Sequence, residues 1–158
     1  MKIRALQKTD RLRLEEIIHS TDNFNQADAK IAMELIDDAI HRGDASDYIV
    51  DVLEDEAGLV LAYVCFGLTP LTDHTFDFYW MVVDSKYQGR GIGVMLFQHV
   101  ESQVRSRGGK LLMCETSSLE GYSRVVLMYE KLGYQFVTRI KDFYRTGDDK
   151  IIYMKYMT

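Results

Sequence analysis

The sequence predicts an α+β fold in which a mixed, mostly antiparallel central sheet is flanked by helices. Segments rich in β-branched and aromatic residues alternate with segments of helical periodicity, in the order β-α-α-β-β-β-α-β-α-β-β. Hydrophobic residues make up 47% of the 158-residue chain, which is enough apolar surface for one core. A single Pro and the absence of repeats or low-complexity tracts leave no sign of a linker. We therefore expect one domain over residues 1–158.

The first half of the chain is expected to hold one strand, two helices and three further strands. A short strand at Lys2–Leu6 precedes Asp10, a favoured N-cap residue, after which apolar residues recur at helical spacing. A second apolar helical face begins at Ala32 and ends before Gly43, a helix stop signal. Three strand-like runs separated by turn-forming residues then predict an antiparallel meander. These runs are Tyr48–Leu53, Leu59–Leu68 and Phe76–Val83.

The second half is expected to hold two helices and three strands. An amphipathic helix begins at Ile92 and ends at the glycine pair 108–109, and the segment Lys110–Glu115 has the composition of a strand. Another apolar helical face ends at Gly133. Two further strands are predicted near Tyr134–Lys141 and Lys150–Lys155.

Composition and charge argue against several classes of function. A formal net charge of −5 argues against a nucleic-acid binder that works by neutralising phosphates. The N-terminus lacks the apolar stretch of a secretory signal, and the longest apolar run is too short to cross a bilayer, so we expect a cytoplasmic protein without a membrane partner. Cys65 and Cys114 lie in apolar segments and are expected to be buried, reduced thiols. The four histidines, of which His99 is expected on a solvent-leaning helix face, have no ligand-like spacing, so no metal site is predicted.

The most specific local feature is a glycine-rich segment, Gln88–Gly93, between a predicted strand and an amphipathic helix. Glycines at alternate positions let the backbone approach an anion, and the first turn of a helix presents unpaired N–H groups and a positive dipole end. Arg90 either adds a charge-assisted bond to the same anion or lies in solvent. The segment lacks the Gly-Lys-Ser/Thr of a Walker loop, and its third glycine comes one position early for a Rossmann fingerprint. It predicts a diphosphate site or, as the alternative, only a tight turn.

Two motifs resemble the GNAT superfamily of acetyl-coenzyme A-dependent N-acetyltransferases. Gln88-Gly-Arg-Gly-Ile-Gly93 satisfies the superfamily signature of Gln or Arg, two residues, Gly, one residue, then Gly or Ala. Tyr129-Glu-Lys-Leu-Gly-Tyr134 looks like the segment that ends the superfamily's last helix. The resemblance implies the GNAT acyltransferase fold over nearly the whole chain and acetyl-CoA as cosubstrate. It also implies an acyltransferase activity toward a primary amine.

The resemblance also implies roles for individual residues. The backbone of the strand end would pair with the pantetheine arm of coenzyme A, and the glycine-rich amides would hold its pyrophosphate. Many members carry Asn near the start of the last helix, where this chain has Tyr122-Ser123, so one usual contact differs. The implied cofactor-binding residues are Met81, Val82, Val83, Gln88, Gly89, Arg90, Gly91, Ile92, Gly93, Val94 and Ser123.

Acetyl transfer to an amine needs a proton acceptor for the nitrogen, stabilisation of an oxyanion and a proton for the departing thiolate. Glu115 is the first choice for the base, because it is the acidic residue of its apolar strand and the resemblance to ribosomal-protein N-terminal acetyltransferases places a functional Glu there. Asp77 and a water chain are the alternatives. Tyr129 is the candidate general acid, although its helical periodicity alone would make it a core residue. The resemblance implies the backbone N–H of Met81 or Val82 as the oxyanion donor.

Other readings of the same sequence remain open. A chain with this fold could bind a coenzyme A thioester as a sensor without turning it over. The strand near Lys150–Lys155, if exposed, could pair with a second copy to form a homodimer. The amine acceptor could be a small polyamine, an amino acid, an antibiotic or a peptide N-terminus, since the sequence does not derive the shape of the acceptor-facing loops.

Overall fold

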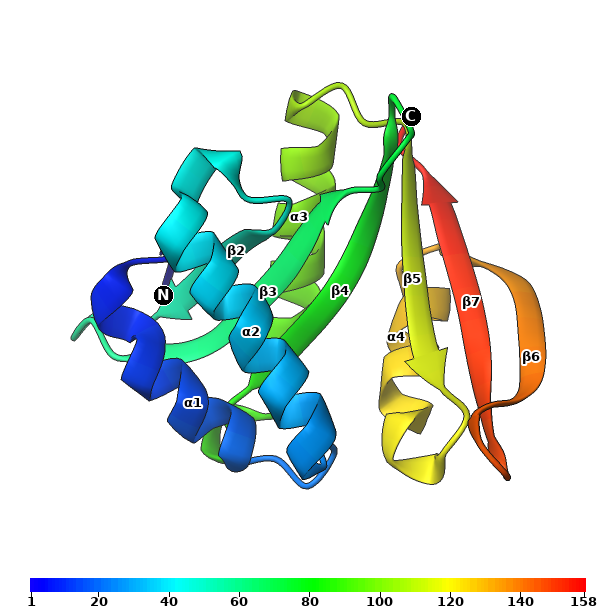
Figure 1. Ribbon diagram of the computed structural model, residues 1–158, viewed down its shortest axis with the longest axis horizontal. Coiled ribbons are helices and arrows are strands. Elements are labelled where there is room, and N and C mark those ends of the chain that lie inside the picture. Colours follow the sequence, from blue (N-terminus) through cyan, green and yellow to red (C-terminus); the bar gives the residue numbers. More distant parts are fainter. The chain divides into compact units, whose positions relative to one another are not determined.

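The structure is a computed structural model that describes residues 1–158. It confirms the predicted order of helices and strands, and its seven strands follow the order β1-β2-β3-β4-β5-β7-β6 in one mixed sheet (Figure 1). The strands are β1 (Lys2–Ala5), β2 (Ile49–Glu54), β3 (Val60–Leu68), β4 (Thr75–Val83), β5 (Leu111–Ser117), β6 (Gln135–Arg145) and β7 (Asp148–Tyr156). The α-helices are α1 (Arg11–His19), α2 (Gln26–Arg42), α3 (Ile92–Ser106) and α4 (Ser123–Lys131).

The chain forms two compact units. The first comprises Met1–Gly67 and Tyr79–Val100, and the second comprises Leu68–Phe78 and Glu101–Thr158. The division falls inside β4 and inside α3. The single domain expected over residues 1–158 stays a prediction. None of the helices combines the length and the apolar character needed to cross a membrane.

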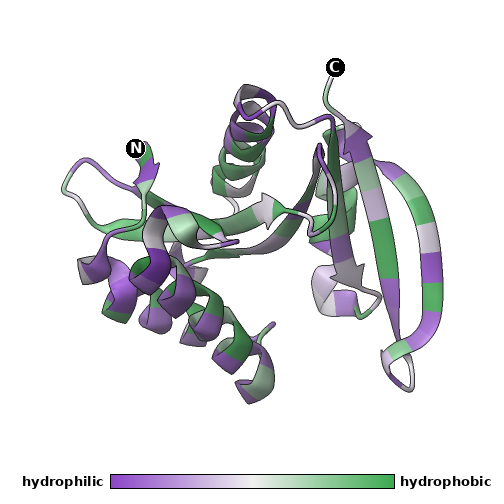
Figure 2. Cartoon of the chain, turned by 45° about the horizontal axis from the view of Figure 1, so that its top comes forward, coloured by the Kyte–Doolittle hydropathy of each residue, from purple (hydrophilic) through white to green (hydrophobic).

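Alternation along β2 and β3 sets the core of the first unit. Successive side chains of a strand point to opposite faces of the sheet, and the apolar side chains of one face pack under α1 and α2. Figures 1 and 2 show these two helices over one face and α3 over the other. The buried set includes Leu14, Ile17, Ala32, Ile36, Val50, Val52, Tyr63, Cys65 and Val82.

The second unit is built around three neighbouring strands. The start of β4 pairs with β5 in parallel, with Phe76 opposite Leu112, and β7 pairs antiparallel with β5 on one side and with β6 on the other. Helix α4 packs on the face that carries Tyr153, against which the ring of Tyr129 lies at a centroid distance of 5.3 Å. Cys114, the partner of Tyr153 in the β5–β7 register, is a buried free thiol, as is Cys65 in the first unit.

One expectation about this unit is wrong. The strand near Lys150–Lys155 is not available to pair with a second copy, because β7 is hydrogen-bonded on both sides and its backbone groups are already satisfied. The edge strand is β6, and every residue of β6 is exposed. The homodimer itself stays a prediction.

Two glycines with ordinary backbone conformations sit in crowded places, and they give a stability prediction. A Cβ atom at Gly67 would lie 2.2 Å from the backbone oxygen of Asp47, whereas one at Gly109 would meet side-chain atoms of Val104 and Phe76, at 2.4 and 2.8 Å. We expect Gly67→Ala to lower the free energy of unfolding by about 2 kcal/mol. Gly109→Ala should cost less, because side chains can shift more easily than a backbone oxygen. Urea denaturation of both variants checks the order, and the reverse order would contradict it.

Candidate active site

The glycine-rich loop connects β4 to α3 in the first unit. A short 3-10 helix at Ser85–Tyr87 follows the strand, and Gly89 and Gly91 then adopt left-handed conformations with φ of 76° and 79°. The N–H of Met95 donates to the carbonyl oxygen of Gly91 at 3.1 Å, which makes Gly91 the residue that caps α3. The amides of residues 92–94 therefore have no acceptor within the helix and are available to an anion. Nothing lies within 4 Å of a Cβ built at Gly89 or Gly91, so the loop backbone is open.

A buried ion pair anchors this loop. Asp84 is 4% exposed. Its carboxylate accepts hydrogen bonds from the backbone N–H of Lys86 at 2.9 Å and from the Nη2 of Arg13 at 2.5 Å. Arg13 also donates to the carbonyl oxygen of Val60 at 3.0 Å. Burial raises the pKa of Asp84, but the bonds from Lys86 and Arg13 outweigh it and hold that pKa below its ordinary value. Sequence reasoning missed Arg13 because no local pattern relates it to a loop so distant in the chain.

The remaining implied cofactor residues of this unit lie along the end of β4 and the loop. Val82 is buried, whereas Met81 and Val83 are half-buried. Gln88 donates its side-chain amide to the carbonyl oxygen of Val83 at 3.2 Å, which folds the loop back toward the strand. Arg90 is exposed, and its guanidinium carbon lies 5.1 Å from the centre of the Tyr87 ring. The roles of Met81 and Val82 as oxyanion donors stay predictions.

Asp77 and Glu115, the two candidate bases, lie in the second unit on the same face of adjacent strands. Asp77 is opposite Met113 in the β4–β5 register, and Glu115 is two residues further along β5, so both side chains point to one face. Burial, followed by the charge of Glu115, raises the pKa of Asp77, while a 2.7 Å hydrogen bond from the Thr69 hydroxyl opposes this rise. The structure therefore brings the two candidates together.

Lys150 completes this cluster and was not predicted. Its Nζ lies 2.7 Å from Oε2 of Glu115, and its charge opposes the rise of the pKa of Asp77. The side chain of Lys150 is 15% exposed, whereas that of Glu115 is 48% exposed. The alternation of residues near Lys150 could have predicted which face of its strand the side chain occupies. It could not have predicted the contact with Glu115, because the sequence does not reveal the register between β5 and β7.

Tyr129 lies on the opposite face of the second unit's strands from these carboxylates. Its ring packs beside those of Tyr153 and Tyr134, at centroid distances of 5.3 and 5.8 Å, and only 3% of the residue is exposed. Because Tyr153 pairs with the residue that precedes Glu115 on β5, alternation places Tyr129 and Glu115 on different faces. Burial raises the pKa of Tyr129 well above its ordinary value, so the phenol holds its proton at neutral pH.

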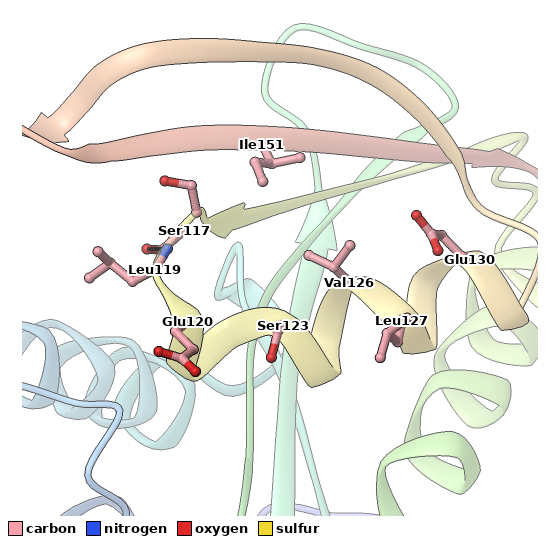
Figure 3. A pocket seen from close by; sticks show the side chains of 9 residues that line it. Ser117, Leu119, Glu120, Ser123, Val126, Leu127, Glu130 and Ile151 are labelled. Carbon is pink, nitrogen blue, oxygen red and sulfur yellow. Dashed lines mark hydrogen bonds between the residues drawn. The ribbon is translucent and has the colours of Figure 1, made fainter.

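A cavity of about 380 Å³ opens beside the first turn of α4 (Figure 3). Its walls combine apolar side chains with hydroxyl and carboxylate groups, and Ser123, the implied cofactor contact of this unit, is one of them. The cavity is lined by Ser117, Ser118, Leu119, Glu120, Ser123, Val126, Leu127, Glu130 and Ile151. It is thus formed by α4, the end of β5, the connection between them and one side chain of β7.

The first two residues of β7 are hydrogen-bonded to the last residue of β5 and the residue that follows it. The hydroxyl of Ser117 donates to the carboxylate of Asp148. The N–H of Asp149 donates to the hydroxyl of Ser118 at 2.8 Å, and the N–H of Ser118 donates to the carbonyl oxygen of Asp149 at 3.0 Å. These bonds hold the start of β7, and with it Lys150, in a fixed place beside β5.

The expected solvent-leaning position of His99 is wrong. Its Nε2 lies 2.7 Å from Oδ2 of Asp51, and the side chain is 21% exposed because this face of α3 covers β2. No group of three or more His, Cys, Asp or Glu side chains is placed to hold a metal ion.

The fold and the glycine-rich loop define a class of protein, and comparison with known proteins agrees with it. Residues 46–136 match the family model described as an acetyltransferase (GNAT) domain. The crystal structure of a GNAT-family protein from Desulfovibrio desulfuricans is 35% identical, covers 99% of each chain and superposes with a TM-score of 0.93. The chain belongs to the GNAT acetyltransferase family, and its mixed seven-stranded sheet is the GNAT fold.

Two further relatives are more distant. A [ribosomal protein bS18]-alanine N-acetyltransferase from Salmonella typhimurium is 28% identical over 90 residues, which are 55% of this chain and 60% of that protein. An acetyltransferase structure from Salmonella typhimurium that contains acetyl-CoA as its cofactor is 20% identical, with a TM-score of 0.76 over 100% of this chain and 94% of that chain. At this level of identity the second likeness concerns the fold alone.

Proposed function

We propose that the chain is an N-acetyltransferase that moves an acetyl group from acetyl-CoA to a primary amine by direct attack in a ternary complex. The observation that carries the proposal is the loop before α3, where left-handed Gly89 and Gly91 leave the helix-start amides open to an anion. These amides fit a pyrophosphate, and Arg90 is exposed where it can add a second, charge-assisted contact. A family-fold structure that contains acetyl-CoA supports the choice of cosubstrate.

Glu115 is the proposed base. An alkylamine has a pKa near 10 in water, so a group of the protein must take its proton once it is bound. Glu115 already accepts an ammonium group, from Lys150 at 2.7 Å, and therefore has the geometry that an amine needs. Asp77 is less suited, because it is only partly exposed, whereas the side chain of Glu115 is 48% exposed and can be reached by an amine from solvent.

Tyr129 is the proposed general acid, and it would approach the leaving sulfur from the face of β5 opposite to that of Glu115. Acetyl-CoA supplies the thioester when it is bound, and the thiolate that leaves it must be protonated. A phenol is protonated at neutral pH even at its ordinary pKa of about 10, so it can donate a proton to the thiolate. Ser123, at the first turn of α4 and in the wall of the 380 Å³ cavity, is proposed to take the place of the Asn contact that other members carry.

The loop assignment predicts the effect of one substitution on acetyl-CoA affinity. Gly91→Ala puts a side chain on a left-handed residue, which costs about 1–3 kcal/mol and should displace the helix-start amides. We expect the Kd for acetyl-CoA, measured by isothermal titration, to rise about tenfold or more. Gly58→Ala is the matched control, because Gly58 has a φ of 82° in the turn between β2 and β3, with open space around it.

The outcome of the titration decides the proposal. If folded wild-type protein does not bind acetyl-CoA, the proposal is wrong. If Gly58→Ala weakens binding as much as Gly91→Ala, the loop has no special part in it. Wild-type protein that binds should next be tested with a panel of amines in a thiol-release assay. Binding without thiol release toward any amine would favour a sensor over an enzyme.

A further inference from the structure

Lys150 is a primary amine held at the proposed base. Its Nζ lies 2.7 Å from the Oε2 of Glu115 and 4.0 Å from the centre of the Phe143 ring. The contacts of the preceding Asp149 with Ser118 fix the backbone beside it. With 15% of its side chain exposed, Lys150 is far less free than a typical surface lysine.

We propose that Lys150 is a self-acetylation site of this chain. The inference rests on the proposed function, since it uses the same base and the same acetyl donor. Glu115 takes a proton from Nζ, and the neutral nitrogen forms a C–N bond with the acetyl carbonyl carbon. The C–S bond of the thioester breaks and the sulfur leaves as a thiolate. The nitrogen loses its second proton as the amide forms, the thiolate takes up one proton, and Glu115 releases the other to solvent. The products are an amide at Lys150 and free coenzyme A.

Geometry distinguishes Lys150 from other lysines of the chain. A general base must lie within about 2.6–3.2 Å of the atom that it deprotonates, and Glu115 meets this condition for Lys150. Lys155 lies on the same strand and also contacts a carboxylate, Glu101, at 2.8 Å. Its Nζ donates as well to the carbonyl oxygen of Leu132 at 2.7 Å, and it lies on the opposite face of β7 from Glu115. Lys155 is therefore a matched internal control.

Modification would change the cluster itself. The amide at Lys150 is uncharged, so it loses both the ion pair with Glu115 and the cation–π contact with Phe143. Glu115 is then free to accept another amine. Acetylation of Lys150 would thus convert a carboxylate occupied by the chain's own ammonium into one that is open to an external acceptor.

The test follows acetylation of individual lysines by peptide mass spectrometry after incubation of the full chain with acetyl-CoA. We expect Lys150 to gain one acetyl group, at a rate per molecule that does not change on dilution, while Lys155 stays unmodified. Lys150→Arg should remove the gain. Glu115→Gln should slow it about 100-fold or more, because the amide cannot take the proton. Glu115 is half exposed, so this variant is expected to fold.

Three results would overturn the inference. The first is a chain that binds acetyl-CoA and acetylates an added amine while Lys150 stays unmodified, which leaves the proposed function intact. The second is equal acetylation of Lys150 and Lys155, or an unchanged rate in Glu115→Gln, since both indicate uncatalysed chemistry. The third is failure to bind acetyl-CoA at all, which removes the proposed function together with the inference.

Discussion

Replacing Glu115 with Gln is expected to lower kcat for acetyl transfer by about 100-fold or more, without weakening acetyl-CoA binding. The amide keeps the size and shape of the side chain but cannot accept the proton of an amine, and general-base catalysis contributes about 10²–10⁴-fold. Steady-state thiol release with an amine from the acceptor panel measures kcat, and titration measures the affinity for acetyl-CoA. An unchanged kcat would remove Glu115 from the base role.

Asp77→Asn is the matched comparison for this variant. Asp77 lies on the same face and is also a carboxylate, but it is less exposed than Glu115, so we expect kcat to fall less than about tenfold. Burial raises the pKa of Asp77, so the folded chain favours its protonated form over its ionised form. The stability that the protonated carboxyl contributes at low pH is lost as pH rises through the raised pKa. Asp77→Asn should therefore be at least as stable as wild type at pH 7. A larger loss of kcat in Asp77→Asn than in Glu115→Gln would move the base role to Asp77.

Sequence patterns predicted every α-helix and strand, because each of these is marked locally, but not the four short 3-10 helices. Helix α2 ends at Arg42, directly before the stop signal Gly43, and α4 ends just before Gly133. The bounds of β6 were less well predicted. This strand runs to Arg145, whereas the sequence predicted an end near Lys141. Asp142 adopts a φ of 51° within a register irregularity, and a turn-forming residue inside a strand looks, in the sequence, like the end of that strand.

Strand order is where sequence reasoning failed. The last strand of a chain is easily taken for an edge, but β7 returns between β5 and β6 and leaves β6 as the edge strand. This order depends on which strand pairs across the sheet, and the alternation of apolar residues does not specify a partner. The same limit explains Lys150, whose contact with Glu115 exists only because β7 runs beside β5.

The candidate site likewise contains residues that local patterns predicted and residues that they missed. The loop residues were predicted because a glycine at alternate positions before a helix is a local signal, and the left-handed Gly89 and Gly91 now give its physical reason. His99 and Arg13 were not predicted to have charged partners, because Asp51 and Asp84 lie far away in the sequence. Burial of Tyr129 agrees with its helical periodicity, but periodicity cannot separate a core phenol from a proton donor.

Asp84→Ala is expected to be the most destabilising of the substitutions considered. The carboxylate is 4% exposed, and its loss leaves the Arg13 guanidinium partly buried without this counter-charge and the N–H of Lys86 without its acceptor. Removing one partner of a buried ion pair costs about 3–5 kcal/mol, and we expect about 3 kcal/mol here because Arg13 keeps its bond to Val60. Urea denaturation measures the free energy of unfolding. The variant should also bind acetyl-CoA more weakly, since the anchor of the loop is gone.

The pH dependence of the free energy of unfolding distinguishes the Arg13–Asp84 ion pair from the backbone turn that Asp84 caps. The pKa of Asp84 is held below its ordinary value of 3.8, so the stability it contributes is present above pH 3.8 and is lost as pH falls through the lowered pKa. The difference between wild type and Asp84→Ala should shrink over that acid range. Asp55→Ala is the control, because Asp55 accepts two backbone N–H groups in the turn before β3, and it should cost only about 1 kcal/mol. Equal losses in the two variants would show that the turn, rather than the pair with Arg13, holds the loop.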